Sequence, residues 1–237
     1  MRRAWLVIVS AALVAAVGCG KDSYEKRLAR TLERLEYERK VKKNLMPAEK
    51  EKKFVDLALW VMPPKEEALA KTGQLPVGEG QFDLDASFND KTADAVLHVL
   101  ARVKMPKKAP AKGAPPPPPP PQRGDFSRDV LGVLSSVFVA AEGLGNPKFA
   151  EESKRGNRFK RLIFTTAEKE VKLYTYKQDN HDVALIFVYD PKLRAALSNK
   201  IDLSLENFAA GAKATRNFNG GADEEADTGS GSPSGPI

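Results

Sequence analysis

The chain has 237 residues, of which 42% are hydrophobic and 29% are charged, with a formal net charge of +7 at pH 7. This length suits one domain of ordinary size with tethers, or two small domains. The single cysteine excludes an internal disulfide, and the only imidazoles are those of His98 and His181.

The first twenty residues have the pattern of an export signal. Two arginines follow Met1, an apolar run covers residues 4–17, and Gly18 precedes Cys19. The run is shorter and richer in small residues than a membrane-spanning helix requires. The segment Ala16-Val17-Gly18-Cys19 resembles the lipobox of bacterial lipoproteins, although leucine is commoner in that family where Ala16 stands.

The resemblance to bacterial lipoproteins implies that residues 1–18 are a signal peptide and that Cys19 carries a diacylglyceryl group. Fatty acyl chains such as palmitate contribute about 0.8 kcal/mol of membrane affinity per buried methylene, so two or three chains form a stable anchor. An acylated Cys19 is then not available for catalysis or metal binding. Because Gly20 stands where retained lipoproteins usually have aspartate, the resemblance implies the periplasmic face of the outer membrane rather than the inner membrane. The alternative is that Cys19 only happens to lie beside an ordinary signal peptide.

Residues 19–53 are predicted to form the lipid anchor and a charged helical stalk. Apolar residues recur every three to four positions between residues 22 and 45, which is typical of an amphipathic helix. Two Glu–Lys pairs at i,i+4 spacing, Glu36–Lys40 and Glu38–Lys42, add a little helix stability. The helix is either a spacer, or a coiled-coil or membrane-surface element, since basic residues exceed acidic ones.

Three strands are expected next. Residues 54–62 alternate apolar and other residues before two prolines, and residues 81–89 alternate more cleanly. Residues 95–104 also have a period of two, although a helix is an open alternative there.

The sequence then changes to Lys, Ala and Pro over residues 105–124, with seven consecutive prolines at 115–121. This insertion is expected to be an extended polyproline segment outside the core, acting as a spacer or as a ligand for an aromatic groove.

The second half begins with an amphipathic helix at Asp125, which Gly143 or Gly145 can end. Three strands are expected at residues 159–166, 170–177 and 183–189. The last is apolar on both faces, so we expect it to be central and covered from both sides. A helix starting at Asp190-Pro191 and a second short helix from about Leu203 follow. They complete a domain of residues 54–213 before a disordered tail at 214–237.

The order of these elements resembles the α/β/α sandwich of the PsbP/Mog family. The residues that carry the resemblance are the buried strand Val183-Ala-Leu-Ile-Phe-Val-Tyr189 and the closing segment Ile201-Asp-Leu-Ser-Leu-Glu-Asn-Phe208. The resemblance implies an α+β fold, an antiparallel sheet flanked by helices, and a binding or assembly role without catalysis. No functional residue is carried over, because no functional motif of the family is matched.

One cluster of charges is a candidate binding site. Five cations surround Phe159 between residues 154 and 161. They are Lys154, Arg155, Arg158, Lys160 and Arg161. Such a cluster can bind phosphates or carboxylates, and in the envelope lipid headgroups or acidic polysaccharide are better candidates than nucleic acid. The alternative is a basic loop leading into a strand.

No pattern in the sequence indicates catalysis, a metal or a cofactor. Asp83, Asp85 and Asp90 do not have the spacing of a calcium loop, and the first two are expected on the polar face of a strand. We expect His98 on a strand and His181 in a hairpin turn.

The sequence therefore predicts a lipid-anchored, non-enzymatic binding or scaffolding protein of the cell envelope, whose partner is another envelope protein or a cell-wall polymer. The alternative function is an envelope hydrolase or small-ligand-binding domain with a dispersed site.

Overall fold

The computed structural model describes residues 24–65, 69–70, 75–90, 95–104, 123–138, 144, 147–166, 168–178 and 180–220. The chain divides into two compact units, residues 1–44 and residues 45–237, and each is described by itself. The expected signal peptide with Cys19, the proline run and the acidic end of the tail lie outside the described residues.

A single helix over residues 24–44 forms the described part of the first unit, which confirms the predicted charged helix. An exposed i,i+4 ion pair joins Arg34 Nε to Glu38 Oε1 at 3.6 Å. The Asn44 side chain donates a hydrogen bond to the Lys40 carbonyl at 2.7 Å, in the last turn of the helix.

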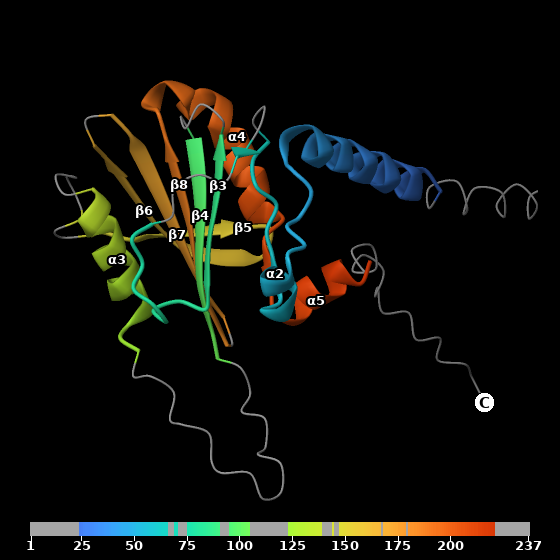
Figure 1. The fold of residues 1–237 in the computed structure, drawn as a ribbon. Coiled ribbons are helices and arrows are strands. Elements are labelled where there is room, and N and C mark those ends of the chain that lie inside the picture. The colour runs from blue at the N-terminus through green and yellow to red at the C-terminus, as the bar shows by residue number, and fades with distance from the viewer. Residues whose placement is uncertain are drawn as a thin grey trace, which may run out of the picture. The chain divides into compact units, whose positions relative to one another are not determined.

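An antiparallel sheet forms the centre of the second unit (Figure 1). Its strand order in the described residues is β2-β3-β4-β8-β7-β6-β5. The strands are β2 (Leu69–Ala70), β3 (Leu84–Asp90), β4 (Ala95–Val103), β5 (Ala150–Lys154), β6 (Asn157–Thr165), β7 (Glu170–Gln178) and β8 (His181–Tyr189). The predicted strands at 81–89, 95–104, 159–166, 170–177 and 183–189 are confirmed, and residues 95–104 are not helical.

Helices cover both faces of this sheet, and each makes a separate apolar core. Helix α3 (Phe126–Val137) packs on one face through Val130, Val133 and Leu134, and helix α4 (Arg194–Glu206) packs on the other (Figure 1). Strand β8 alternates between the two cores, with Leu185 and Phe187 in one and Ile186 in the other. The predicted α+β class with an antiparallel sheet flanked by helices is therefore confirmed, as is the burial of β8 from both sides.

The segment predicted as a strand over residues 54–62 has a different structure. Helix α2 covers Lys52–Asp56, and only β1 (Leu59–Trp60) is extended, where it pairs with β9 (Ala209–Ala210). The buried residues include Phe54 and Leu57, whereas Val55 is 43% exposed. A three-residue spacing between buried side chains fits a helical turn, so the strand prediction was wrong for the first half of this segment.

Three further boundaries differ from the sequence-based expectation. Helix α3 ends at Val137, before Gly143 and Gly145, both of which lie outside the described residues. The two helices expected after Asp190 are a 3-10 turn, η1 (Pro191–Leu193), followed by one continuous α4. Helix α5 (Ala212–Phe218) continues the ordered chain past Lys213. This helix packs against β1 through Phe218, whose ring lies edge-on against the Trp60 ring with centroids 5.0 Å apart.

Candidate cationic binding surface

The predicted basic cluster lies on a β-hairpin rather than in a loop. Strands β5 and β6 pair directly, with Lys154 opposite Asn157, and Arg155 and Gly156 form the turn between them. Both turn residues have positive φ, 46° and 84°. A two-residue turn of this kind matches the twist of paired strands and favours glycine at its second position. The alternative of a basic loop leading into a strand is therefore met only in part: the turn leads into β6, but Lys154 already belongs to β5.

The hairpin divides the predicted cations between the two faces of the sheet. Side chains alternate along a strand, so Arg158 and Lys160 lie on the same face as Leu162, which belongs to the α3 core. Lys154 and Arg161 lie on the opposite face, where α4 packs. The structure therefore does not bring all five cations together.

The cations on the α4 face are neutralised by carboxylates. Lys154 Nζ lies 3.1 Å from Glu152 Oε1 and 3.0 Å from Asp202 Oδ1, and Arg161 lies 2.7 Å from Glu152 Oε2. Burial alone would lower the pKa of Lys154, but its hydrogen bonds to Asp202 and Glu152 outweigh burial and raise it. These two cations join β5, β6 and α4, and their charge is already compensated.

The cations on the α3 face form a different group. Arg158 and Lys160 are exposed, and Lys160 pairs across the strands with Thr175 of β7. Phe159 pairs with Tyr176, so Lys177, the next residue of β7, lies beside Arg158. We call Arg158, Lys160 and Lys177 the cationic patch.

Nearby acidic side chains neutralise the cations of the patch only weakly. Lys177 is 80% exposed, and its Nζ is 4.0 Å from Asp182 Oδ1, at the limit of an ion pair. Glu151 lies opposite Lys160 in the register and is exposed. Exposed pairs of this kind contribute at most about 1 kcal/mol. Three cations on adjacent strands thus stay accessible to anionic groups.

Lys177 is the patch residue that sequence reasoning missed. It lies 16 or more residues from the predicted cluster, and no local charge pattern links it to Arg158. The signal that could have found it is the β6–β7 hairpin register, because pairing across a short turn fixes which residues are neighbours. Arg155 lies at the hairpin turn, beside this end of the patch.

A serine and a histidine meet elsewhere on the α3 face. Ser87 Oγ lies 2.7 Å from His98 Nδ1, and the two residues are opposite each other on β3 and β4. His98 is 8% exposed, and burial lowers its pKa to about 4. His98 is on a strand, as predicted. The other histidine, His181, begins β8 rather than lying in the turn, and its Nε2 is 3.0 Å from the Leu57 carbonyl oxygen.

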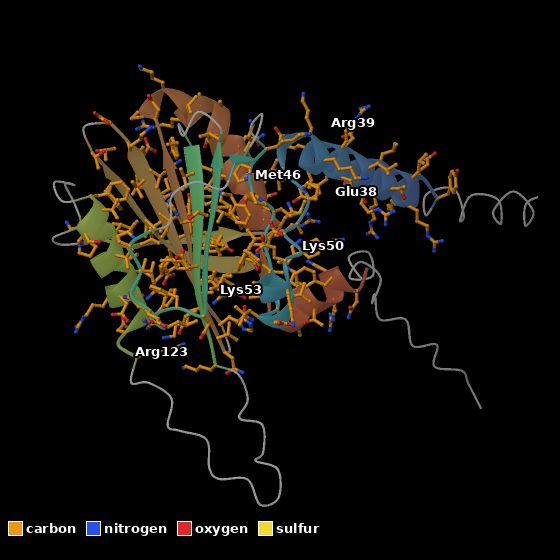
Figure 2. All side chains as sticks on the ribbon, in the orientation of Figure 1. Glu38, Arg39, Met46, Lys50, Lys53 and Arg123 are labelled. Carbon is orange, nitrogen blue, oxygen red and sulfur yellow. The ribbon has the colours of Figure 1, made fainter. Side chains whose placement is uncertain are left out.

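Asp83, one of the aspartates considered as metal ligands, has other partners. Asp83 accepts two hydrogen bonds from Arg123 at 2.7 and 2.8 Å, and a third from the Val103 backbone at 2.9 Å. The Arg123 bond chiefly lowers the pKa of Asp83. Arg123 is labelled in Figure 2, directly before α3. Within the described part of the chain, no group of three or more His, Cys, Asp or Glu side chains could hold a metal ion.

Two ion pairs, each with one buried partner on the sheet, join the helices to the sheet. Arg102 of β4 contacts Asp129 of α3 and also donates to the Gly124 carbonyl at 2.9 Å. On the other face Glu170, 2% exposed, accepts hydrogen bonds from Tyr189 and Arg194, each at 2.6 Å. Burial raises the pKa of Glu170, but these donors lower it further than burial raises it. The charged groups of both clusters have partners within the protein, so these clusters stabilise the fold and are not candidate ligand sites.

The comparisons with known proteins add one structural similarity. No family model matches the chain, and no curated protein matches it. The chain is similar to the solution structure of cyanobacterial PsbP (CyanoP) from Synechocystis sp. PCC 6803, at 12% identity and a TM-score of 0.43, over 71% of this chain and 93% of that one. That protein belongs to the group that the sequence pattern resembles. A similarity at this level supports no conclusion about the function of this chain.

Proposed function

We propose that this protein is a lipid-anchored, non-catalytic binding protein of the cell envelope, and that its cationic patch binds an acidic polymer. The anchor would be an acylated Cys19, which the lipobox pattern supports, with the outer membrane as its site. None of the helices in the described ranges has the length and apolar character to span a bilayer. The observation that carries the binding proposal is the exposure of Arg158, Lys160 and Lys177 on one face of two paired strands.

The geometry of the patch suits an extended, repeating anion. Residues two apart on a strand are separated by about 7 Å, and neighbouring strands by about 5 Å. Arg158 and Lys160 have the first spacing, and Lys177 lies on the neighbouring strand directly after Tyr176, which pairs with Phe159. Carboxylates repeated along a polysaccharide can meet cations at these intervals, and such contacts weaken as salt screens them.

The Ser87–His98 contact does not support the alternative of a hydrolase. A general base is effective when its pKa lies near the working pH. His98 has a pKa of about 4 because it is buried, so it is a weak proton acceptor at neutral pH. The pair instead satisfies a buried polar side chain, which is the ordinary role of such a contact.

The proposal is tested by neutralising the patch. We expect the triple variant Arg158→Gln, Lys160→Gln, Lys177→Gln to bind polygalacturonate about tenfold more weakly than the wild type, since each exposed ion pair is worth up to about 1 kcal/mol. Binding is measured by calorimetry at low and moderate salt, and neutral dextran should not bind.

A charge-matched variant separates the patch from overall charge. Lys52, Lys192 and Lys213 are also exposed lysines, and none lies on β6 or β7. Replacing all three with glutamine removes the same charge, and affinity should stay close to that of the wild type. Equal weakening in both triple variants would show unspecific attraction, and unchanged affinity in the patch variant would also rule the proposal out.

A further inference from the structure

The N-terminal helix, residues 24–44, carries a stripe of exposed apolar side chains. Tyr24, Leu28, Leu32 and Leu35 are 67%, 47%, 52% and 50% exposed. With about 100° between consecutive residues of a helix, these four positions lie within roughly 80° of one another. Large apolar side chains aligned in this way on a helix indicate a surface that another phase or molecule covers.

The charges of the same helix favour an anionic surface. Residues 24–44 contain eight lysines and arginines and four glutamates. Four of the cations, including Arg39 (Figure 2), lie in the last six residues of the helix, where no glutamate is present. Their long aliphatic stems can lie along an apolar surface while the charge reaches polar headgroups. A helix with an apolar stripe, low mean hydropathy and many cations is typical of one that lies in a membrane interface.

The sequence also limits how far this helix can be from a membrane. Tyr24 is five residues after Cys19, and five fully extended residues span at most about 18 Å. If Cys19 is acylated, which is part of the function proposed above, the start of the helix is held within that distance of the bilayer surface. The stripe begins at Tyr24 itself.

A second copy of the chain is a poorer match for the stripe. A two-stranded coiled coil needs apolar residues repeated every three and four positions over several heptads. Leu28 and Leu35 are one heptad apart, but the next position in that series is Lys42. The alternate series reads Tyr24, Thr31 and Glu38, so the apolar seam ends after less than two heptads.

We propose that the N-terminal helix lies flat on the bilayer that holds the acyl chains, with its apolar stripe in the interface and its cations on anionic phospholipid headgroups. The acyl group alone would leave the orientation of the chain open. A second, peptide contact close to the anchor fixes the direction in which the chain leaves the membrane.

The test uses two labelled variants of the acylated full-length protein. Acylation blocks Cys19, so Leu35→Cys and Glu33→Cys each provide a single free thiol for an environment-sensitive fluorophore. The two positions are about 160° apart around the helix. Each protein is placed in vesicles of phosphatidylcholine, with or without phosphatidylglycerol, that contain nitroxide-labelled lipid as a quencher.

We expect severalfold stronger quenching at position 35 than at position 33 in vesicles with phosphatidylglycerol. The difference should fall in phosphatidylcholine alone and at high salt, while the acyl chains hold the protein in both kinds of vesicle. Equal quenching at the two positions would overturn the inference. Disulfide crosslinking between two copies at position 35 on the vesicles would also overturn it and would identify a second copy as the occupant.

The intact mass of each preparation separates this inference from the proposed anchor. A protein without acyl chains contradicts the anchor, and the same two labelled positions on a Cys19→Ser background still allow the helix to be tested with added vesicles. The cationic-patch variant tests the other part of the proposed function, and it should not change the quenching at either position.

Discussion

The protonation of His98 depends on its buried position in the sheet. His98 is 8% exposed on β4, and burial lowers its pKa to about 4 from the ordinary 6.5. Between these two values the unfolded chain binds a proton that the folded chain does not. The part of the unfolding free energy that depends on His98 being neutral is therefore present in full above about pH 6.5. It decreases as the pH falls toward 4. Over this window we expect the loss to reach about 3 kcal/mol, from 1.36 kcal/mol per pKa unit.

An NMR titration of the His98 ring, with unfolding free energies measured at the same pH values, checks this expectation. The ring resonance should stay in its neutral form down to about pH 5. His98→Asn, which cannot titrate, should lose less stability than the wild type over the same range, whatever its stability at neutral pH. A ring that titrates near the ordinary histidine value would contradict the burial seen here.

Single residues also show why the candidate site was only partly predictable. Arg158 and Lys160 were identified from local charge density, which is a property of the sequence alone. Their separation from Lys154 and Arg161 follows from strand alternation, and the neutralising role of Asp202 depends on a helix about forty residues away. Lys177 enters the patch only through the β6–β7 register. Local sequence thus indicates the charge, whereas pairing across the fold decides which charges remain accessible.

At the scale of elements, the β5–β6 hairpin depends on one glycine. Gly156 has φ of 84°, whereas Gly132 lies in the middle of helix α3, and an added Cβ would meet nothing within 4 Å at either position. The two sites therefore differ in backbone conformation and not in available space. Gly156→Ala should destabilise the protein by about 1–2 kcal/mol, because alanine is strained at positive φ.

The same substitution at Gly132 should change the stability in the opposite direction. Gly132→Ala should stabilise the protein by up to about 1 kcal/mol, because alanine is the better helix former. Urea unfolding of both variants beside the wild type gives the two values. A similar effect in both would mean that the turn does not have the φ described here. In that case the division of cations between the two faces would need revision.

Elements with a single clear period were predictable, and short ones were not. Strands β6, β7 and β8 alternate apolar and polar residues or are wholly apolar, and a turn separates each pair. Strand β5, Ala-Glu-Glu-Ser-Lys, has no apolar alternation, because it is an edge strand recruited through the hairpin turn. In residues 54–61 a helical turn is joined directly to an extended segment, and the mixed spacing resembles a strand period.

At the scale of the whole molecule, the fold class followed from one strand. The apolar residues on both faces of β8 require cover on both sides of the sheet, and the structure has α3 on one side and α4 on the other. The order β4-β8-β7 was not predictable from local pattern, because β4 and β8 are separated by the proline-rich insertion, α3 and three strands. Long-range pairing of this kind is set by tertiary packing.

The proposed acyl anchor at Cys19 bears on both the cationic patch and the N-terminal helix. If Cys19 is acylated, the partners of the cationic patch lie outside the cytoplasm and the N-terminal helix is held near a bilayer.

Intact-mass and N-terminal analysis of the protein extracted from its native membranes tests this claim most directly. We expect a mature chain that begins at Cys19 and carries the mass of a diacylglyceryl group, with a further acyl chain on its amino group where the cell adds one. A chain that keeps residues 1–18 and has a free thiol at Cys19, recovered from the cytoplasmic fraction, would contradict it.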